Sequence, residues 1–136
     1  MEDICERLCA AHGLAGYPVD VWRLAAQLGV RVRVAEWGRL PHAVWILEAR
    51  LILTNARRSE AMRRFDVAHE LGHVVLQAER YHGARENRFA ACLLMPAREF
   101  RLETLAANGD WATVGQMFGV TAAAAARRGK ELGWHG

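Results

Sequence analysis

The sequence predicts an α+β fold, in which a small three-stranded antiparallel or mixed sheet packs on a bundle of helices. Three observations support this prediction. The chain has 136 residues, which is enough for one domain with a real hydrophobic core. Residues 30–54 contain short segments with the period of strands, and the segments on both sides have apolar residues at helical spacing. We therefore expect a single domain over 1–136, with a core at 1–107 and a helical pair at 108–136.

Two helices are expected before the sheet, over residues 2–12 and 18–28. In the second, the apolar residues at positions 21, 24, 25 and 28 form one stripe. Pro18 suits a helix start, Asp20 lies in the first turn, and Gly29 suits the C-terminal cap. We therefore expect this helix to pack one face against the core.

Three short strands should follow. Residues 30–34 alternate strictly between valine and arginine, which predicts a strand with one buried face. Residues 43–47 and 51–54 predict two more strands, and their connection is short enough for a hairpin.

A long helix is expected from an N-cap at Ser59 to about Arg80. Because it is apolar on nearly every side, it should be buried on most faces. Another helix is expected over 84–94, closed by Met95 and Pro96. After a break at 108–110, two short helices around Gly119 are similar to a helix-turn-helix.

The composition is typical of a globular protein outside the membrane. Apolar residues make up 52% and charged residues 24%, and every apolar run is shorter than the roughly 20 residues of a membrane span. The N-terminus is acidic, unlike a secretory signal. The three cysteines, Cys5, Cys9 and Cys92, contain no CxxC pair and are expected to be small buried side chains. We expect a cytoplasmic protein that does not bind a membrane.

The net charge of +3 is too small to indicate nucleic-acid binding by itself. The last expected helix carries Arg127, Arg128 and Lys130, as a DNA-reading helix could. However, it consists mostly of alanine and offers few side chains that could contact base edges. We therefore expect it to pack within the fold or dock a partner, and not to bind DNA.

The chemistry is expected in the long apolar helix, where His69, Glu70 and His73 are polar interruptions. Burying these groups without partners would cost several kcal/mol. Residues i and i+4 lie one turn apart on one face, so both imidazoles can bind one metal ion. Glu70 lies beside that ion and is placed to accept a proton from metal-bound water. This is the H-E-x-x-H pattern of zinc metallopeptidases, in which zinc polarises the scissile carbonyl.

The residues from Phe65 to Leu76, followed by Asn87 to Pro96, resemble the ImmA/IrrE family of metallopeptidases. The resemblance covers nearly the whole chain. It implies an intracellular protease that cleaves helix-turn-helix repressors and so releases stress-response or mobile-element genes. By position, His69 and His73 match the zinc-binding histidines of the family, and Glu70 matches its catalytic glutamate.

The third zinc ligand departs from the family pattern, because Gly83 stands where the family usually has glutamate. A catalytic zinc site needs a third protein ligand and an open position for water. Glu86, one helical turn further along, is the expected ligand. His82 is the alternative, and Glu79 lies nearby in the sequence.

Two further positions are expected to have supporting roles. Asp66, where the family more often has threonine, could orient the His69 imidazole from one turn away. Tyr81 or His82 could donate a hydrogen bond to the oxyanion formed during peptide hydrolysis.

Two other functions stay open. The chain could be a non-catalytic regulator that kept the fold, lost the third ligand at Gly83, and binds DNA or a repressor. It could also be a zinc hydrolase acting on a bond other than a peptide, because the motif alone does not specify the substrate.

Overall fold

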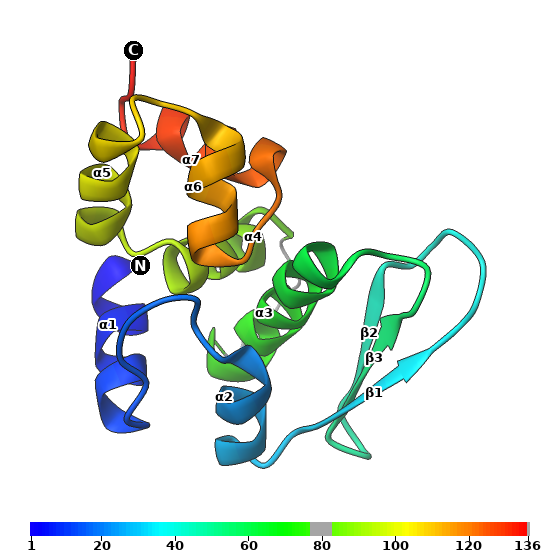
Figure 1. Cartoon of the computed structure of the whole chain (residues 1–136). Helices are drawn as coiled ribbons and strands as arrows, with labels where there is room; N and C mark the ends of the chain where they lie inside the picture. Colours follow the sequence, from blue (N-terminus) through cyan, green and yellow to red (C-terminus); the bar gives the residue numbers. More distant parts are fainter. Residues whose placement is uncertain (77–82, 136) are drawn as a thin grey trace. The chain divides into compact units, whose positions relative to one another are not determined.

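Three strands and seven helices make up the residues that the structure, a computed structural model, describes: 1–76 and 83–135 (Figure 1). In chain order they are α1 (Glu2–Ala11), α2 (Val21–Gln27), β1 (Arg31–Ala35), β2 (Ala43–Ile46), β3 (Leu51–Asn55), α3 (Glu60–Leu76), α4 (Gly83–Leu94), α5 (Ala97–Ala106), α6 (Trp111–Phe118) and α7 (Ala122–Glu131). The predicted α+β class is confirmed.

The sheet has the strand order β1-β3-β2 and is mixed. β2 and β3 form the predicted antiparallel hairpin, and β1 runs parallel to β3. The prediction that β1 has one buried face is wrong, because Val34 is 54% exposed. β1 lies at the edge of the sheet, where only one neighbouring strand covers it.

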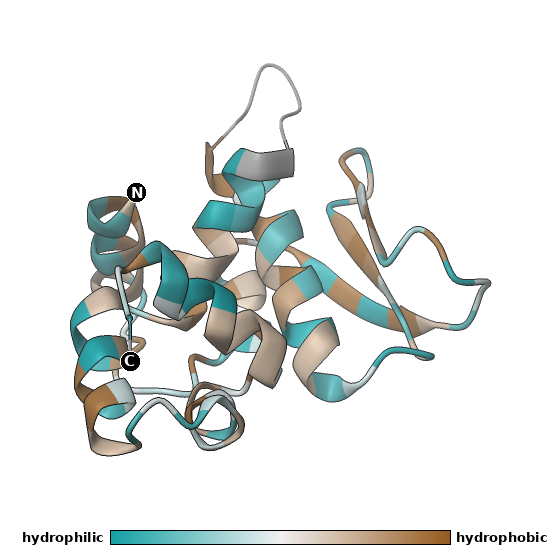
Figure 2. Cartoon of the chain, turned by 90° about the horizontal axis from the view of Figure 1, so that it is seen from above, coloured by the Kyte–Doolittle hydropathy of each residue, from teal (hydrophilic) through white to brown (hydrophobic). Residues whose placement is uncertain are grey.

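The chain folds into two compact units, one over Asp20–Ala90 and one over Met1–Val19 with Ala91–Gly136. In the first, α3 packs on β2 and β3, and α2 packs on α3 and β1. Its core consists of fully buried side chains from these elements and from α4, among them Val21, Leu24, Ile52, Val67, Leu71 and Phe89. Figure 2 shows hydrophobic residues along much of the strands. The proposed division at residue 107 stays a prediction.

Two side-chain caps set where the helices of this unit begin. Asp20 accepts a hydrogen bond from the Arg23 backbone N–H at 3.0 Å, so α2 begins at Val21 and not at residue 18. Ser59 accepts from the Met62 N–H at 3.2 Å, which confirms the predicted start of α3. The predicted end of this helix at Arg80 lies outside the described residues.

α3 is enclosed over most of its described length. Its buried residues are Arg64, Asp66, Val67, Ala68, Leu71 and Gly72. Glu60 and Met62, in the first turn, are the exposed residues among positions 60–76, and the others are partly buried. The structure therefore agrees with the expectation of burial on most faces over these residues.

The second unit is helical. α5 is a helix that was not predicted from the sequence. α6 and α7 form the predicted helix pair: Asp110 caps α6 and Thr121 caps α7. Between them Gly119 has φ +68°, a left-handed conformation that glycine adopts without a steric penalty.

A hydrogen-bonded network ties α1, α4 and α7 together in this unit. One oxygen of the Glu2 carboxylate accepts from Arg128 at 2.7 Å and from the Cys92 thiol at 3.0 Å. Arg128 also donates to the Met95 carbonyl at 3.0 Å and is only 3% exposed. This arginine is therefore used in packing, as expected for the last helix, while Lys130 is exposed.

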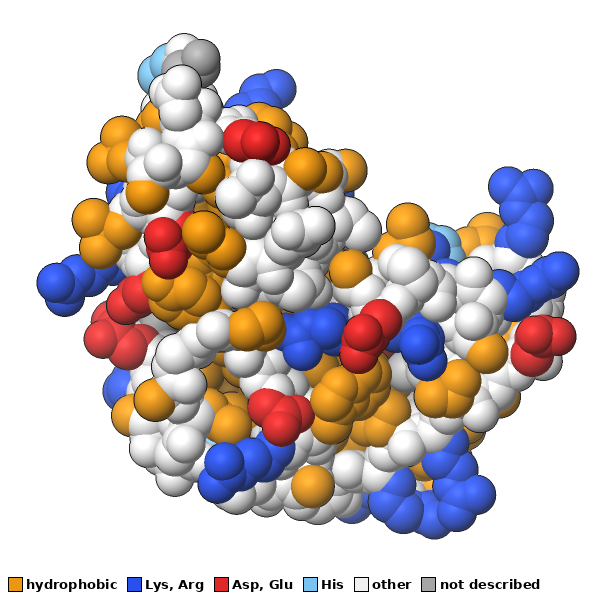
Figure 3. Space-filling model, viewed as in Figure 1, with side chains coloured by type: hydrophobic (Ala, Val, Ile, Leu, Met, Phe, Trp, Pro, Cys, Tyr) orange, Lys and Arg blue, Asp and Glu red, His pale blue; other side chains and the backbone are white. Residues whose placement is uncertain are grey.

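Cys5 and Cys92 are buried and Cys9 is partly buried, and none of these three described residues forms a disulfide. No described helix is both long and apolar enough to cross a bilayer. On the face seen in Figure 3, basic and acidic side chains are interspersed.

Candidate metal centre

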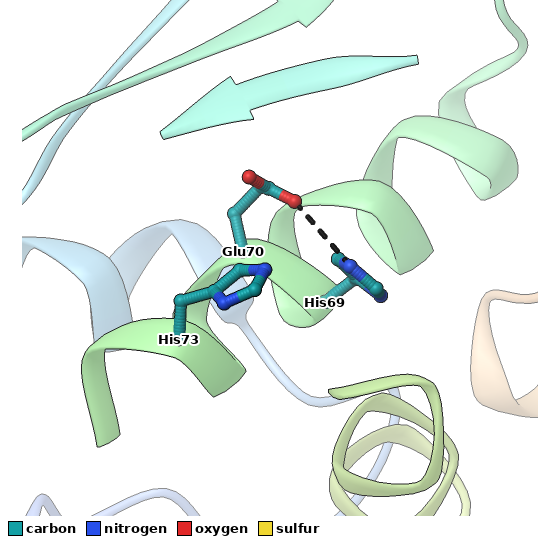
Figure 4. Close-up of side chains that lie close together, drawn as sticks. All are labelled: His69, Glu70 and His73. Carbon is teal, nitrogen blue, oxygen red and sulfur yellow. Dashed lines mark ion pairs between the residues drawn. The ribbon is translucent and has the colours of Figure 1, made fainter. Parts of the chain in front are cut away.

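The centre is built on the buried part of α3, where three side chains meet. His69, Glu70 and His73 each offer a ligand atom, and these atoms lie within 4.8 Å of one another. In Figure 4 the two imidazoles lie one turn apart on the helix and Glu70 points toward the sheet. The predicted cluster is thus confirmed as a group that could hold a metal ion.

The His69 ring is held by a residue of α4. Its Nδ1–H donates to the Asn87 side-chain oxygen, with 2.7 Å between the two atoms. This bond fixes the tautomer in which Nε2 carries the free lone pair. A histidine that donates one ring N–H to a carbonyl oxygen and presents the other nitrogen is the usual arrangement around a bound metal. The His69 side chain is therefore already oriented as a ligand.

Glu70 occupies a partly buried position beside His69, with 3.6 Å between its Oε2 and the His69 Nε2. Burial raises the pKa of Glu70 to about 7, and the negative charges of Asp66 and Glu86 add to this effect. A hydrogen bond from the Trp45 backbone N–H acts in the opposite direction. A carboxyl group with a pKa near neutrality can both accept and release a proton at physiological pH.

His73 lies edge-on to His69, with 5.3 Å between the ring centroids. Burial lowers its pKa, the Glu86 carboxylate opposes this shift, and His69 adds to it. The neutral imidazole is favoured at pH 7, and only the neutral form has a lone pair to give a metal.

Glu86 provides a test of whether the site fits a metal ion. It is fully buried, its Oε2 lies 3.9 Å from the His73 Nδ1, and neither carboxylate oxygen has a hydrogen-bond partner among the described residues. An unsatisfied buried carboxylate is costly, and a cation beside it would remove the cost. The donor set of two imidazoles and a carboxylate is one that zinc accepts in catalytic sites. These residues fit a metal ion, but the Glu86 oxygens do not belong to the group of ligand atoms within 4.8 Å of one another, which consists of His69, Glu70 and His73.

The close approach of α4 to α3 explains how Glu86 becomes buried. A Cβ at Gly72 would lie 3.2 Å from the Glu86 Cγ and 3.2 Å from the Phe89 ring. Both distances are shorter than ordinary contacts, so a side chain at position 72 would push α4 away. This explains the glycine inside the H-E-x-x-H segment.

One residue of the predicted site is corrected, and three lie outside the described residues. Asp66 does not orient His69, because it forms an ion pair with Arg58 at 2.6 Å. Asn87 orients the His69 ring instead. His82, the alternative ligand, lies outside the described residues, as do Glu79 and Tyr81.

Two groups that contribute to the candidate metal centre were not found from the sequence. Asn87 follows Glu86 directly, and a polar amide beside the expected third ligand was the signal for it. The Trp45 N–H carried no signal, because any residue at that strand position supplies one.

Two comparisons with known proteins found matches. Residues 25–130 match the model of Peptidase_M78, the IrrE N-terminal-like domain. A Mycobacterium tuberculosis transcriptional regulator of known structure is similar in fold, with a TM-score of 0.73 and 17% identity. The match covers 91% of this chain and 44% of the regulator, so the chain spans less than half of that protein. A search of curated proteins gave no match. The chain belongs to the IrrE N-terminal-like family of M78 peptidases.

Proposed function

We propose that the protein is a zinc-dependent endopeptidase that acts inside the cell, and that it cleaves a helix-turn-helix transcriptional repressor. One observation supports the enzymatic part above all. The Glu86 carboxylate lies buried beside His73 without a hydrogen-bond partner in the described chain, while Asn87 presents the Nε2 of His69. The repressor substrate rests on the family resemblance.

His69, His73 and Glu86 are the proposed zinc ligands, and Glu70 is the proposed catalytic base. Glu70 also belongs to the tight cluster with the two histidines. We assign it to proton transfer because its pKa of about 7 suits a group that exchanges protons with substrate and water. When bound, zinc would supply Lewis acidity for the peptide carbonyl and for water.

The remaining steps belong to side chains and backbone of this chain. Glu70 accepts the proton of the attacking water and delivers it to the leaving amine. β2 lies at an edge of the sheet and its Trp45 N–H contacts Glu70, so an extended substrate could add to that edge beside the base.

The first experiment measures metal content and coordination, which need no substrate. Purified protein should hold about one zinc per chain, and the cobalt-substituted form should show the visible absorption of a low-coordinate site. His73→Ala should abolish both signals, while His135→Ala, a change of an exposed histidine, should alter neither. Failure of the protein to bind either zinc or cobalt when each is added would refute the proposed function as a zinc-dependent peptidase.

The second experiment tests catalysis with a panel of purified helix-turn-helix repressors as substrates. Glu70→Gln should retain the metal and lower the cleavage rate about 10³-fold, because it removes the proton acceptor. Equal cleavage by Glu70→Gln and the unchanged protein would refute the role of Glu70.

A second candidate is the non-catalytic regulator that binds DNA or a repressor. It is favoured by Gly83 at the usual ligand position and by the helix pair α6–α7. The similar mycobacterial protein is named a transcriptional regulator. This function predicts DNA retardation or repressor binding that neither His73→Ala nor Glu70→Gln alters.

A further inference from the structure

A cavity in the helical unit has a lining that nothing in the peptidase function uses. It has a volume of about 220 Å³ and lies between α5 and the residues at the end of α7. The lining includes Phe100, Arg101, Thr104, Leu105, Leu132 and Trp134. All belong to the unit that contains residues 91–136.

The floor and one edge of the cavity come from successive turns of α5. Phe100 and Thr104 are buried, whereas Arg101 and Leu105, the next residue in each turn, are exposed. Residues at positions i, i+1, i+4 and i+5 lie on adjoining faces of a helix. The cavity therefore has an apolar interior and a cationic group at its rim.

Two polar groups at this cavity lack a partner among the described residues. Thr104 is 2% exposed and its hydroxyl forms no hydrogen bond with that part of the chain, which is costly for a buried group. Arg101 forms no ion pair or hydrogen bond with the residues that the structure describes. The two residues are three positions apart on α5, which places them as neighbours on the helix surface.

The walls of the cavity indicate the chemical nature of the rest of the ligand. Phe100 and Trp134 supply aromatic surface and Leu132 supplies aliphatic surface. A cavity of about 150 Å³ with such walls can hold a benzene ring, so about 220 Å³ has room for a ring and a few further atoms.

We propose that this cavity binds a small apolar monocarboxylate, with its ring or branched chain against Phe100, Leu132 and Trp134 and its carboxylate on the guanidinium group of Arg101. Guanidinium groups bind carboxylates through paired charge-assisted hydrogen bonds. The site goes beyond the peptidase function and does not depend on it.

The test uses 4-fluorophenylacetate, whose fluorine signal in NMR reports weak binding directly. A ligand of about ten non-hydrogen atoms is expected to bind the full chain saturably, with a Kd of about 0.1–1 mM. Arg101→Gln should weaken binding at least roughly tenfold, because the carboxylate loses its charged partner. Arg98→Gln removes an exposed arginine of the same helix outside the cavity lining and should change the Kd less than about twofold.

Two further measurements distinguish binding in this cavity from weak binding elsewhere on the chain. Leu132→Ala removes part of the apolar wall and should weaken binding several-fold. The neutral 4-fluorophenylacetamide should bind at least roughly tenfold more weakly than the acid. Equal binding of acid and amide would overturn the carboxylate class, and no saturable binding up to about 10-fold above the expected Kd would overturn the site. Glu70→Gln should bind the acid like the unchanged chain, so a failure of the peptidase proposal leaves this result intact.

Discussion

Two clusters of polar groups in this chain differ in how their charges are balanced. In the helical unit, the Glu2 carboxylate, the Arg128 guanidinium and the Cys92 thiol are paired with one another, and Arg128 also binds the Met95 carbonyl. At the metal centre, the fully buried Glu86 carboxylate has no hydrogen-bond partner within the described ranges 1–76 and 83–135.

The difference separates a cluster whose charges are already paired from one whose charge a bound cation would balance. A paired cluster contributes stability, because removing one member exposes the others to an uncompensated cost. An unpaired buried carboxylate lowers stability until something binds it. Substitutions in the two clusters should therefore have opposite effects on the metal-free protein.

The largest effect is expected for Glu86→Met. Loss of one of three protein ligands should lower the affinity for zinc about 10³-fold, or about 4 kcal/mol. The metal-free chain should become more stable by about 1–3 kcal/mol, because a buried charge is replaced by an apolar side chain of similar size. Zinc competition with a chelating dye and urea unfolding in EDTA measure the two quantities.

The control for this change is Glu48→Gln, which alters an exposed carboxylate in the turn before β3. It should leave both quantities unchanged. A metal-free Glu86→Met protein that is less stable than the original would show that Glu86 stabilises the fold. The two clusters would then not differ in their effect on stability.

Arg128→Met should have the next largest effect, a fall of about 3 kcal/mol in the free energy of unfolding. The Met95 carbonyl and the Glu2 carboxylate both lose the guanidinium as their donor. Zinc affinity should not change. The nearby Lys130→Met alters an exposed side chain and should cost less than about 0.5 kcal/mol by urea unfolding. Similar losses for both variants would mean that the paired network contributes little.

The pH dependence of the metal-free chain provides a third comparison. The pKa of Glu70 is raised from 4.5 to about 7, so the folded chain binds more protons than the unfolded chain between these values. Stability should therefore fall, by about 2 kcal/mol, as the pH rises from 4.5 to about 7. Glu70→Gln should remove this part of the profile, measured by urea unfolding in EDTA. Identical profiles would show that Glu70 titrates normally.

The smallest effect is expected for Asn87→Ala, which removes the hydrogen bond that orients His69. Zinc affinity should fall about tenfold. This is the lower end of the losses seen when a hydrogen-bond partner of a metal ligand is removed, because Asn87 is exposed and water can replace its oxygen. Arg88→Ala, at the adjacent exposed position, should leave the affinity unchanged. A loss as large as that of Glu86→Met would identify Asn87 as a ligand.

The sequence was sufficient to predict those parts of the molecule that depend on local pattern. The i, i+4 spacing of His69 and His73 with Glu70 between them determines which side chains meet, once the segment is helical. The Ser59 cap and the β2–β3 hairpin also follow from short-range preferences, and the structure confirms both.

Other features depend on contacts between distant segments and were missed or misjudged. The burial of Glu86 requires α4 to approach α3 across Gly72, which no local pattern encodes. Asp66 lies at the right spacing for His69, but Arg58 binds it. Val34 fits a buried strand pattern, yet β1 is at the sheet edge and leaves it exposed.

The order of the two compact units along the chain has a consequence for synthesis. The helical unit combines residues 1–19 with those from Ala91 onward, and Glu2 finds its partners Cys92 and Arg128 only in the later part. At about 5–20 residues per second the ribosome needs on the order of several seconds to make the intervening segment. During that time α1 emerges without its partners. Nascent chains halted near residue 100 should therefore expose α1 to chaperones and proteases.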